Sequence, residues 1–172
     1  SDYMLKIKVE RTHEDAVIPE FAHPTDSGFD LFTCEDTAIH AGQTAIVPTG
    51  LRFEIPQGWG VQIKNKSGIT VKGVPVYTEE HGFNPFEIEL VNKGERAHIT
   101  VFEGTVDMDY RGDIGIMVRN DSKHKITIPA QTKIAQGVLR QVFYCEFEEV
   151  DTVETNTARG EGGYGSTGTE KK

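Results

Sequence analysis

The residue types near the end of the chain suit the binding of a polyphosphate. Residues 159–168 read Arg-Gly-Glu-Gly-Gly-Tyr-Gly-Ser-Thr-Gly, and five of the ten are glycine. Glycine packs nothing into a core, but it allows backbone N–H groups to approach a ligand closely. With Arg159, Ser166 and Thr167, such N–H groups supply the donors that an oligophosphate requires, and the ring of Tyr164 could cover a base. The alternative is a flexible glycine-rich linker, against which the arginine and the tyrosine argue.

Two further clusters place polar groups beside glycine. Residues 24–31 read Pro-Thr-Asp-Ser-Gly-Phe-Asp-Leu, which predicts a turn leading into a strand. Residues 64–68 read Lys-Asn-Lys-Ser-Gly and follow a predicted strand. A short helix is expected at 67–72 with Ser67 as its cap. N–H groups, a hydroxyl and an ammonium group would then converge as they do in anion sites, although a solvated turn explains the segment equally well.

A third cluster pairs two carboxylates. Residues 104–112 read Gly-Thr-Val-Asp-Met-Asp-Tyr-Arg-Gly, and on a strand Asp107 and Asp109 would point to the same side. One alternative is a β-hairpin tip with solvated charges. Another is a cation site, but two carboxylates alone under-ligate calcium and no EF-hand spacing follows.

Short strands must position these clusters. Apolar and polar residues alternate with period two in several segments, which predicts half-buried strands. The segments are 5–10, 51–55, 59–64, 86–90, 97–101 and 114–118. Short strands separated by turn residues predict an all-β jelly roll or barrel. Residues 151–158 are polar, so we expect a β domain at 1–150 and a flexible arm at 151–172.

Composition narrows the classes of function. A chain of 172 residues fits one domain, and its net charge of −9 excludes a general nucleic-acid binder. No run of about 18 apolar residues is present, so no membrane span is expected. No signal peptide is visible, which predicts a cytoplasmic protein. Cys34 and Cys145 lack CxxC partners and are expected as reduced thiols, and the histidine spacing predicts no zinc site.

The clusters, in this order, resemble the five motifs of the homotrimeric dUTPase family. The matching segments are Ser27–Leu31, Lys66–Gly68, Gly104–Asp113, Lys133–Gln136 and Arg159–Gly168. The third and fifth are specific, whereas the second and fourth are degenerate. The resemblance implies a distorted jelly-roll or β-barrel homotrimer with three sites at subunit interfaces and a mobile arm that closes over the nucleotide. It also implies hydrolysis of dUTP to dUMP and pyrophosphate with Mg²⁺, keeping uracil out of DNA and supplying dUMP for dTMP synthesis.

The resemblance also implies a role for each matching residue. Asp107 would be the base that activates water at the α-phosphorus, and Asp30 would hold waters of the Mg²⁺ shell. The residues that would contact the α- and β-phosphates are Lys66, where the family has arginine, Ser67, Gly68 and Gln136. The backbone around Thr105, Val106 and Met108 would read the uracil edge, with Tyr110 packed under the deoxyribose. In the arm, the implied contacts are Arg159 with Ser166 and Thr167 on the γ-phosphate, and Tyr164, between Gly163 and Gly165, stacked on uracil.

The chain departs from the family pattern in two places. Val101 stands where the family commonly has asparagine, and the spacing between Ser67 and Asp107 is longer than usual. We interpret residues 76–97 as an inserted β-hairpin with its turn around Asn92–Glu95. Small phage members of the family often carry such insertions, so a phage or prophage source is a hypothesis.

Other functions remain open. The chain could instead be a regulatory module that binds a protein partner through the 76–97 insert, with or without catalytic activity. A dCTP deaminase shares the fold, but the related deaminases lack this glycine-rich arm, and assaying ammonia against pyrophosphate separates the two. A purely structural jelly roll would leave Asp107, Tyr110 and Arg159 unexplained.

Overall fold

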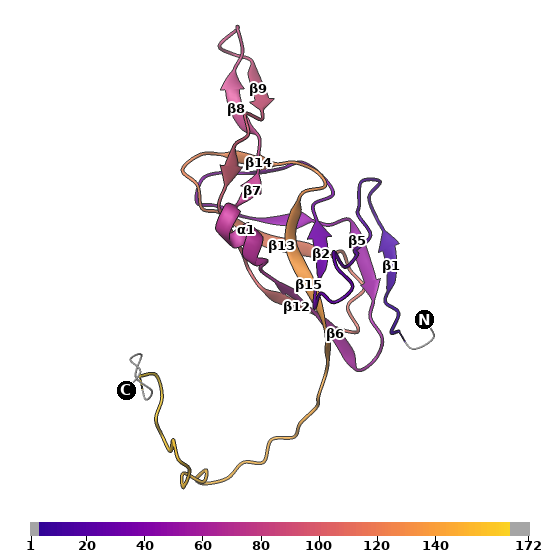
Figure 1. Ribbon diagram of the computed structural model, residues 1–172, viewed down its shortest axis with the longest axis vertical. Coiled ribbons are helices and arrows are strands. Elements are labelled where there is room, and N and C mark those ends of the chain that lie inside the picture. The colour runs from indigo at the N-terminus through magenta and orange to yellow at the C-terminus, as the bar shows by residue number, and fades with distance from the viewer. Residues whose placement is uncertain (1–3, 166–172) are drawn as a thin grey trace. The chain divides into compact units, whose positions relative to one another are not determined.

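The structure is a computed structural model that describes residues 4–165 (Figure 1). The chain divides into two units after Val142. The first is a compact β unit, and the second, which starts at Phe143, contains no strand or helix among the residues described up to 165. The compact unit therefore ends before residue 150, where the sequence placed the boundary.

The first unit is built almost entirely from short strands. Its elements are β1 (Lys8–Arg11), β2 (Phe29–Phe32), β3 (Thr37–Ile39), β4 (Thr44–Pro48), β5 (Leu51–Glu54), β6 (Trp59–Lys64), α1 (Ser67–Lys72), β7 (Val74–Pro75), β8 (Thr78–His81), β9 (Ile88–Val91), β10 (Arg96–Ala97), β11 (Ile99–Val101), β12 (Gly104–Val106), β13 (Gly115–Asn120), β14 (Ile126–Ile128) and β15 (Lys133–Gln141). The prediction of an all-β fold is confirmed.

Two sheets enclose most of the core. One has the order β12-β6-β15-β2 and the other the order β11-β13-β4, with every pairing antiparallel. The remaining strands form the pairs β1-β5, β7-β10, β3-β14 and β8-β9. On β13, Ile116, Val118 and Asn120 are buried while the residues between them are exposed. Burial on alternate residues explains the period of two in the sequence.

The predicted elements differ from the observed ones in several details. Helix α1 spans 67–72 as predicted, but its N-cap is Lys66, whose side chain makes no capping hydrogen bond, so Ser67 is not the cap. The predicted strand 97–101 is broken into β10 and β11, because β10 pairs with β7 whereas β11 pairs with β13. The first predicted strand is shorter, since only Lys8–Arg11 pair with β5.

Strands β8 and β9 form a hairpin that projects from the β unit (Figure 1). Its turn lies at 82–87, where Glu87 N–H donates to the carbonyl of Asn84 at 2.9 Å. The turn that we expected at 92–95 does not close this hairpin, because β10 beyond it pairs with β7. Four apolar side chains of the hairpin are exposed, namely Phe83, Phe86, Ile88 and Leu90.

Two smaller findings concern membrane crossing and the thiols. Within residues 4–165, no helix has the length and apolar character needed to traverse a bilayer. Cys34 is buried and Cys145 is exposed, and both are free thiols.

Candidate active site

Asp30 belongs to the predicted cluster at 24–31 and lies on β2. Strand β15 runs between β2 and β6, so Gln136 is opposite Asp30 on one side and Lys64 on the other. The Asp30 side chain is buried, and its Oδ1 accepts a short hydrogen bond from Lys66 Nζ. Its Oδ2 accepts a contact from Lys133 Nζ at 3.1 Å. Three segments far apart in the sequence are therefore joined at one carboxylate.

Opposing effects set the pKa of Asp30. Burial raises the pKa of the carboxyl, but the hydrogen bonds and positive charges of Lys66 and Lys133 outweigh burial and leave the pKa below its ordinary value of 3.8. A carboxyl group whose pKa is lower in the folded than in the unfolded state stabilises the fold at pH values above its unfolded-state pKa. This stabilisation is lost as the pH falls through the folded-state pKa.

Replacing Asp30 with asparagine is expected to lower the free energy of unfolding at pH 7 by about 1–3 kcal/mol, because two charge-assisted hydrogen bonds are weakened. The difference from the unmodified protein should shrink once the pH is below 3.8. Urea unfolding at pH 7 and at pH 3 measures both values. A larger difference at pH 3 than at pH 7 would contradict the assignment.

Gln136 links this cluster to the start of α1. Its Nε2 donates to the carbonyl of Asn65 at 2.7 Å, just before Lys66 and Ser67. Gly28 leaves room for this contact, since a Cβ at residue 28 would lie 2.5 Å from Gln136 Oε1. The sequence singled out the segment containing Gly28, but its role as a spacer for Gln136 could be found only from the structure.

Replacing Gly28 with alanine should therefore push the Gln136 amide away from Asn65. For dUTP, the substrate that the sequence resemblance implies, we expect KM to rise about fivefold, the equivalent of one lost hydrogen bond of about 1 kcal/mol. Steady-state kinetics measure the change. The matched control is Gly60→Ala, because a Cβ at residue 60 meets only ordinary contacts, the nearest at 3.6 Å. Equal KM values for the two variants would refute the spacer role.

Four cationic side chains line a groove beside this cluster, which we call the cation groove: Lys66, Lys72, Arg96 and Lys133. Its volume is about 420 Å³, and Gly68 is also part of its lining. In a chain with a net charge of −9, this groove concentrates positive charge locally, as an anion site would require. Among the described residues, no group of three His, Cys, Asp or Glu side chains is placed to hold a metal ion.

The predicted cluster at 104–112 continues from β12 into a loop. Asp107 and Tyr110 are both exposed. Tyr110 N–H donates to the Asp107 carbonyl at 3.1 Å, and the Tyr110 hydroxyl donates to the Asp113 carbonyl at 2.7 Å. Arg52 Nε donates to Asp113 Oδ1 at 2.9 Å, and this hydrogen bond holds the pKa of Asp113 below its ordinary range. The loop is thus tied at its end to β5, a contact the sequence did not reveal.

The structure excludes two interpretations of this loop that the sequence left open. Strand β12 ends at Val106 and a turn follows at 108–109, so Asp107 and Asp109 do not share one face of a strand. The loop is also not a hairpin tip, because β12 pairs with β6 whereas β13 pairs with β4 and β11. It crosses from one sheet to the other.

Asp107 lies in a second groove, of about 390 Å³, which we call the Asp107 groove. Other predicted residues in its lining are Thr105, Val106 and Tyr110. The Val106 side chain is buried in the core, and Met108 Sδ accepts a hydrogen bond from Gly58 N–H at 3.4 Å. Val101 is buried on β11. Among the described residues, the Asp107 groove and the cation groove share no lining residue.

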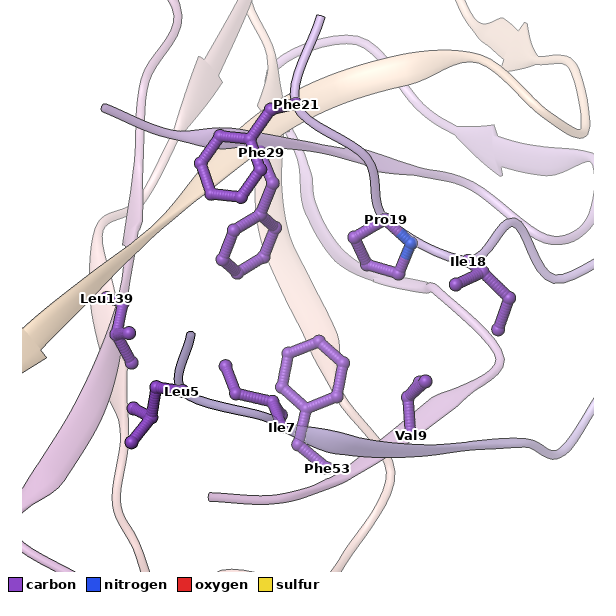
Figure 2. A pocket seen from close by; sticks show the side chains of 9 residues that line it. All are labelled: Leu5, Ile7, Val9, Ile18, Pro19, Phe21, Phe29, Phe53 and Leu139. Carbon is purple, nitrogen blue, oxygen red and sulfur yellow. The ribbon is translucent and has the colours of Figure 1, made fainter. Parts of the chain in front are cut away.

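A third hollow, of about 250 Å³, has a different character (Figure 2). Its lining is apolar and includes no predicted site residue. The Phe29 ring packs edge-on against Phe21 and Phe53, with ring centroids 5.9 and 6.3 Å apart. The packed rings around this hollow support β2, which carries Asp30. The lining of the hollow offers no group for acid–base chemistry.

The glycine-rich segment belongs to the second unit. Arg159 Nε donates to the Gly162 carbonyl at 2.6 Å, and Arg159 Nη2 donates to the Gly163 carbonyl at 3.3 Å. Tyr164 is exposed and Gly165 has a φ of 85°. The predicted residues Ser166 and Thr167 lie outside the described residues. The Arg159 side chain thus closes a small loop formed by the residues that directly follow it.

Comparisons with known proteins agree on one family. A family model described as dUTPase matches residues 14–97 and 92–168. The chain is 36% identical over 164 residues to the deoxyuridine 5'-triphosphate nucleotidohydrolase of Gloeothece citriformis (strain PCC 7424), covering 95% of this chain and 97% of that relative.

Solved structures show the same fold. The Staphylococcus bacteriophage 80alpha dUTPase with dUPNHPP matches at a TM-score of 0.74 and 23% identity, covering 95% of this chain and 98% of that one. The dUTPase from phage phi11 of S. aureus, solved to visualise its species-specific insert, matches at a TM-score of 0.66 and 22% identity, covering 87% and 99%. The expected jelly-roll fold is confirmed.

Proposed function

This chain belongs to the dUTPase family and hydrolyses dUTP to dUMP and pyrophosphate, and we propose how its residues divide that work. One observation carries the proposal. Of the implied phosphate-binding residues, Lys66 and Gly68 line the cation groove, whereas several of the implied nucleoside-binding residues and the implied general base line the Asp107 groove. Each end of the nucleotide thus has its own set of groups.

The cation groove receives the phosphates. Lys66 and Gly68 line it, and Ser67 follows Lys66 directly at the start of α1. Gln136 holds the preceding Asn65 carbonyl, so it supports the same segment. Lys66 supplies charge without the two-pronged hydrogen bonding that an arginine would offer. Its hydrogen bond to Asp30 fixes the ammonium group in place before a phosphate arrives.

The Asp107 groove receives the nucleoside. The buried Val106 side chain leaves only its backbone for the uracil edge, while Thr105 is exposed beside it. Tyr110 is held by its hydroxyl to Asp113, so its ring has a fixed place against the deoxyribose. Backbone groups paired to one base edge reject a base with the wrong pattern of donors and acceptors.

Asp107 is the general base. Its carboxylate takes a proton from the attacking water as the new bond forms between the water oxygen and the α-phosphorus. The bond from the α-phosphorus to the bridging oxygen breaks, and pyrophosphate leaves. An exposed carboxylate suffices, because such a water needs only a modest base and firm positioning.

The complete site forms between subunits of a homotrimer. Support comes from the two grooves, which share no lining residue in the described part of the chain. One subunit would offer its Asp107 groove to the cation groove of a neighbour, and an arm would supply Arg159. Light scattering should give the mass of three chains.

The described residues do not fit a Mg²⁺ ion ligated directly by the protein. Asp30 is the implied acidic residue, and both of its oxygens already accept contacts from Lys66 and Lys133. Mg²⁺ keeps several waters readily, so the substrate phosphates would hold the ion, with Asp30 reaching it through water. When bound, the ion neutralises phosphate charge.

The test is pyrophosphate release from dUTP compared with dCTP, dTTP and UTP, with and without Mg²⁺. We expect pyrophosphate release from dUTP but not from dCTP, dTTP or UTP. Without Mg²⁺, pyrophosphate release from dUTP should be strongly reduced. Ammonia release from dCTP would instead indicate a deaminase. Absence of pyrophosphate from dUTP with Mg²⁺ present would refute the proposal.

A second function, binding of a protein partner, is favoured by the projecting hairpin. Phe83 is fully exposed and Phe86 is 92% exposed, and neighbouring apolar side chains on a protruding surface often mark an interaction site. The phage 80alpha dUTPase is described as controlling the transfer of virulence genes. If this chain has such a role, removing the two phenylalanines should abolish partner binding, whereas Asp107→Asn should keep it.

A further inference from the structure

Helix α1 carries the phosphate-binding segment but cannot be stable by itself. It has six residues, none of them buried, and its N-cap residue Lys66 makes no side-chain capping hydrogen bond. Isolated helices below about 12 residues are marginal in water. Contacts from elsewhere in the protein must therefore hold it in shape.

Arg96 supplies two such contacts at the C-terminal end of α1. Its Nε donates to the Lys72 carbonyl at 2.8 Å, and its Nη2 donates to the Gly73 carbonyl at 2.7 Å. The last carbonyls of a helix lack partners within the helix, and a cation at that end also interacts favourably with the helix dipole. A planar guanidinium can bridge two neighbouring acceptors, which a lysine cannot do in the same way.

The backbone fixes Arg96 relative to this helix end. In the β7-β10 pair, Arg96 is opposite Pro75 and Ala97 is opposite Val74, directly after the helix. Gly73 has a φ of 69°, and a Cβ there would lie 2.4 Å from the Ala97 carbonyl oxygen. The chain that leaves α1 is thus packed closely against the strand that carries Arg96.

We infer that Arg96 is a positioning residue for the substrate phosphates. It holds α1 from its C-terminal end so that Lys66, Ser67 and Gly68 at the other end keep their places beside the cation groove, which Arg96 also lines. The inference rests on the proposed function. It divides the 76–97 segment into two parts: β10, which serves the phosphate site, and the β8-β9 hairpin, which does not.

The test compares ligands with and without phosphates. In Arg96→Gln, KM for dUTP and the Kd of a non-hydrolysable imido analogue of dUTP should both rise about tenfold, the effect of losing hydrogen bonds from a charged donor. The Kd of deoxyuridine, which has no phosphate, should stay unchanged in calorimetry. Arg96→Lys should recover only part of the loss, because it restores the charge but not both hydrogen bonds.

The matched control is Arg119→Gln. Arg119 also donates hydrogen bonds to two residues, Asp121 and Thr100, but it does not line the cation groove. Shortening the hairpin within 80–89 should likewise leave KM unchanged. Unaltered dUTP binding in both Arg96 variants would overturn the inference, as would an equal loss for deoxyuridine or full recovery by lysine. If the unmodified protein itself failed to bind the analogue, the proposed function would be what fails.

Discussion

Replacing Asp107 with asparagine is expected to lower kcat for dUTP by about 10²–10⁴-fold, the usual contribution of a general base. Asparagine has nearly the same size but cannot take the proton of the attacking water. Asp107 is exposed on the loop after β12, so the substitution should leave the fold intact. Pyrophosphate release measures kcat, and calorimetry with an imido analogue of dUTP should show nearly unchanged binding.

The neighbouring carboxylate provides the control for this experiment. Asp109 is also exposed but does not line the Asp107 groove, so Asp109→Asn should retain most of the activity. Full turnover by Asp107→Asn would show that another group activates the water. Loss of analogue binding in that variant would show that Asp107 binds the substrate instead.

Deleting the residues after Asp151 is expected to lower kcat/KM for dUTP by about 10²-fold or more, because the arm would position the phosphates and exclude water. The midpoint of thermal unfolding should hardly change. The strands all lie before Val142, and residues 152–161 are exposed, so their loss removes little packing.

A point substitution in the chain without truncation separates the contribution of the Arg159 guanidinium to kcat/KM from that of the rest of the arm. Arg159→Gln should reproduce a large part of the loss in kcat/KM, since Arg159 is the implied γ-phosphate clamp. Dissociation of the trimer after truncation would contradict the prediction and give the arm a structural role. Full activity of the truncated chain would exclude the arm from catalysis.

Sequence patterns predicted several of the half-buried strands but not the longest strand, β15. On β6 and β13, alternate residues are buried or nearly so, which made both strands visible as patterns of period two. On β15, consecutive pairs such as Ile134 and Ala135 are buried, so both faces of this strand are covered. Burial on both faces removes the alternation, so the longest strand could not be predicted in this way.

The site was predictable as a set of residues but not as a network. The sequence motifs identified Asp30 and Lys66 as site residues. They included Lys133 only as part of a degenerate motif. That both lysines contact one buried carboxylate depends on the order β6-β15-β2, which no local pattern specifies. Arg96 was missed for a similar reason, since its partners are the carbonyls of Lys72 and Gly73, more than twenty residues earlier.

The place of β15 in the chain has a consequence for synthesis on the ribosome. Strands β6 and β2 do not pair with each other, and both are completed only by β15, at residues 133–141 of 172. A nascent polypeptide therefore exposes the edges of both strands until β15 has been translated, and long-range pairing of this kind is slow and prone to aggregation. Release of the last β residues from the exit tunnel, rather than emergence of the first motifs, is the event that allows this domain to fold.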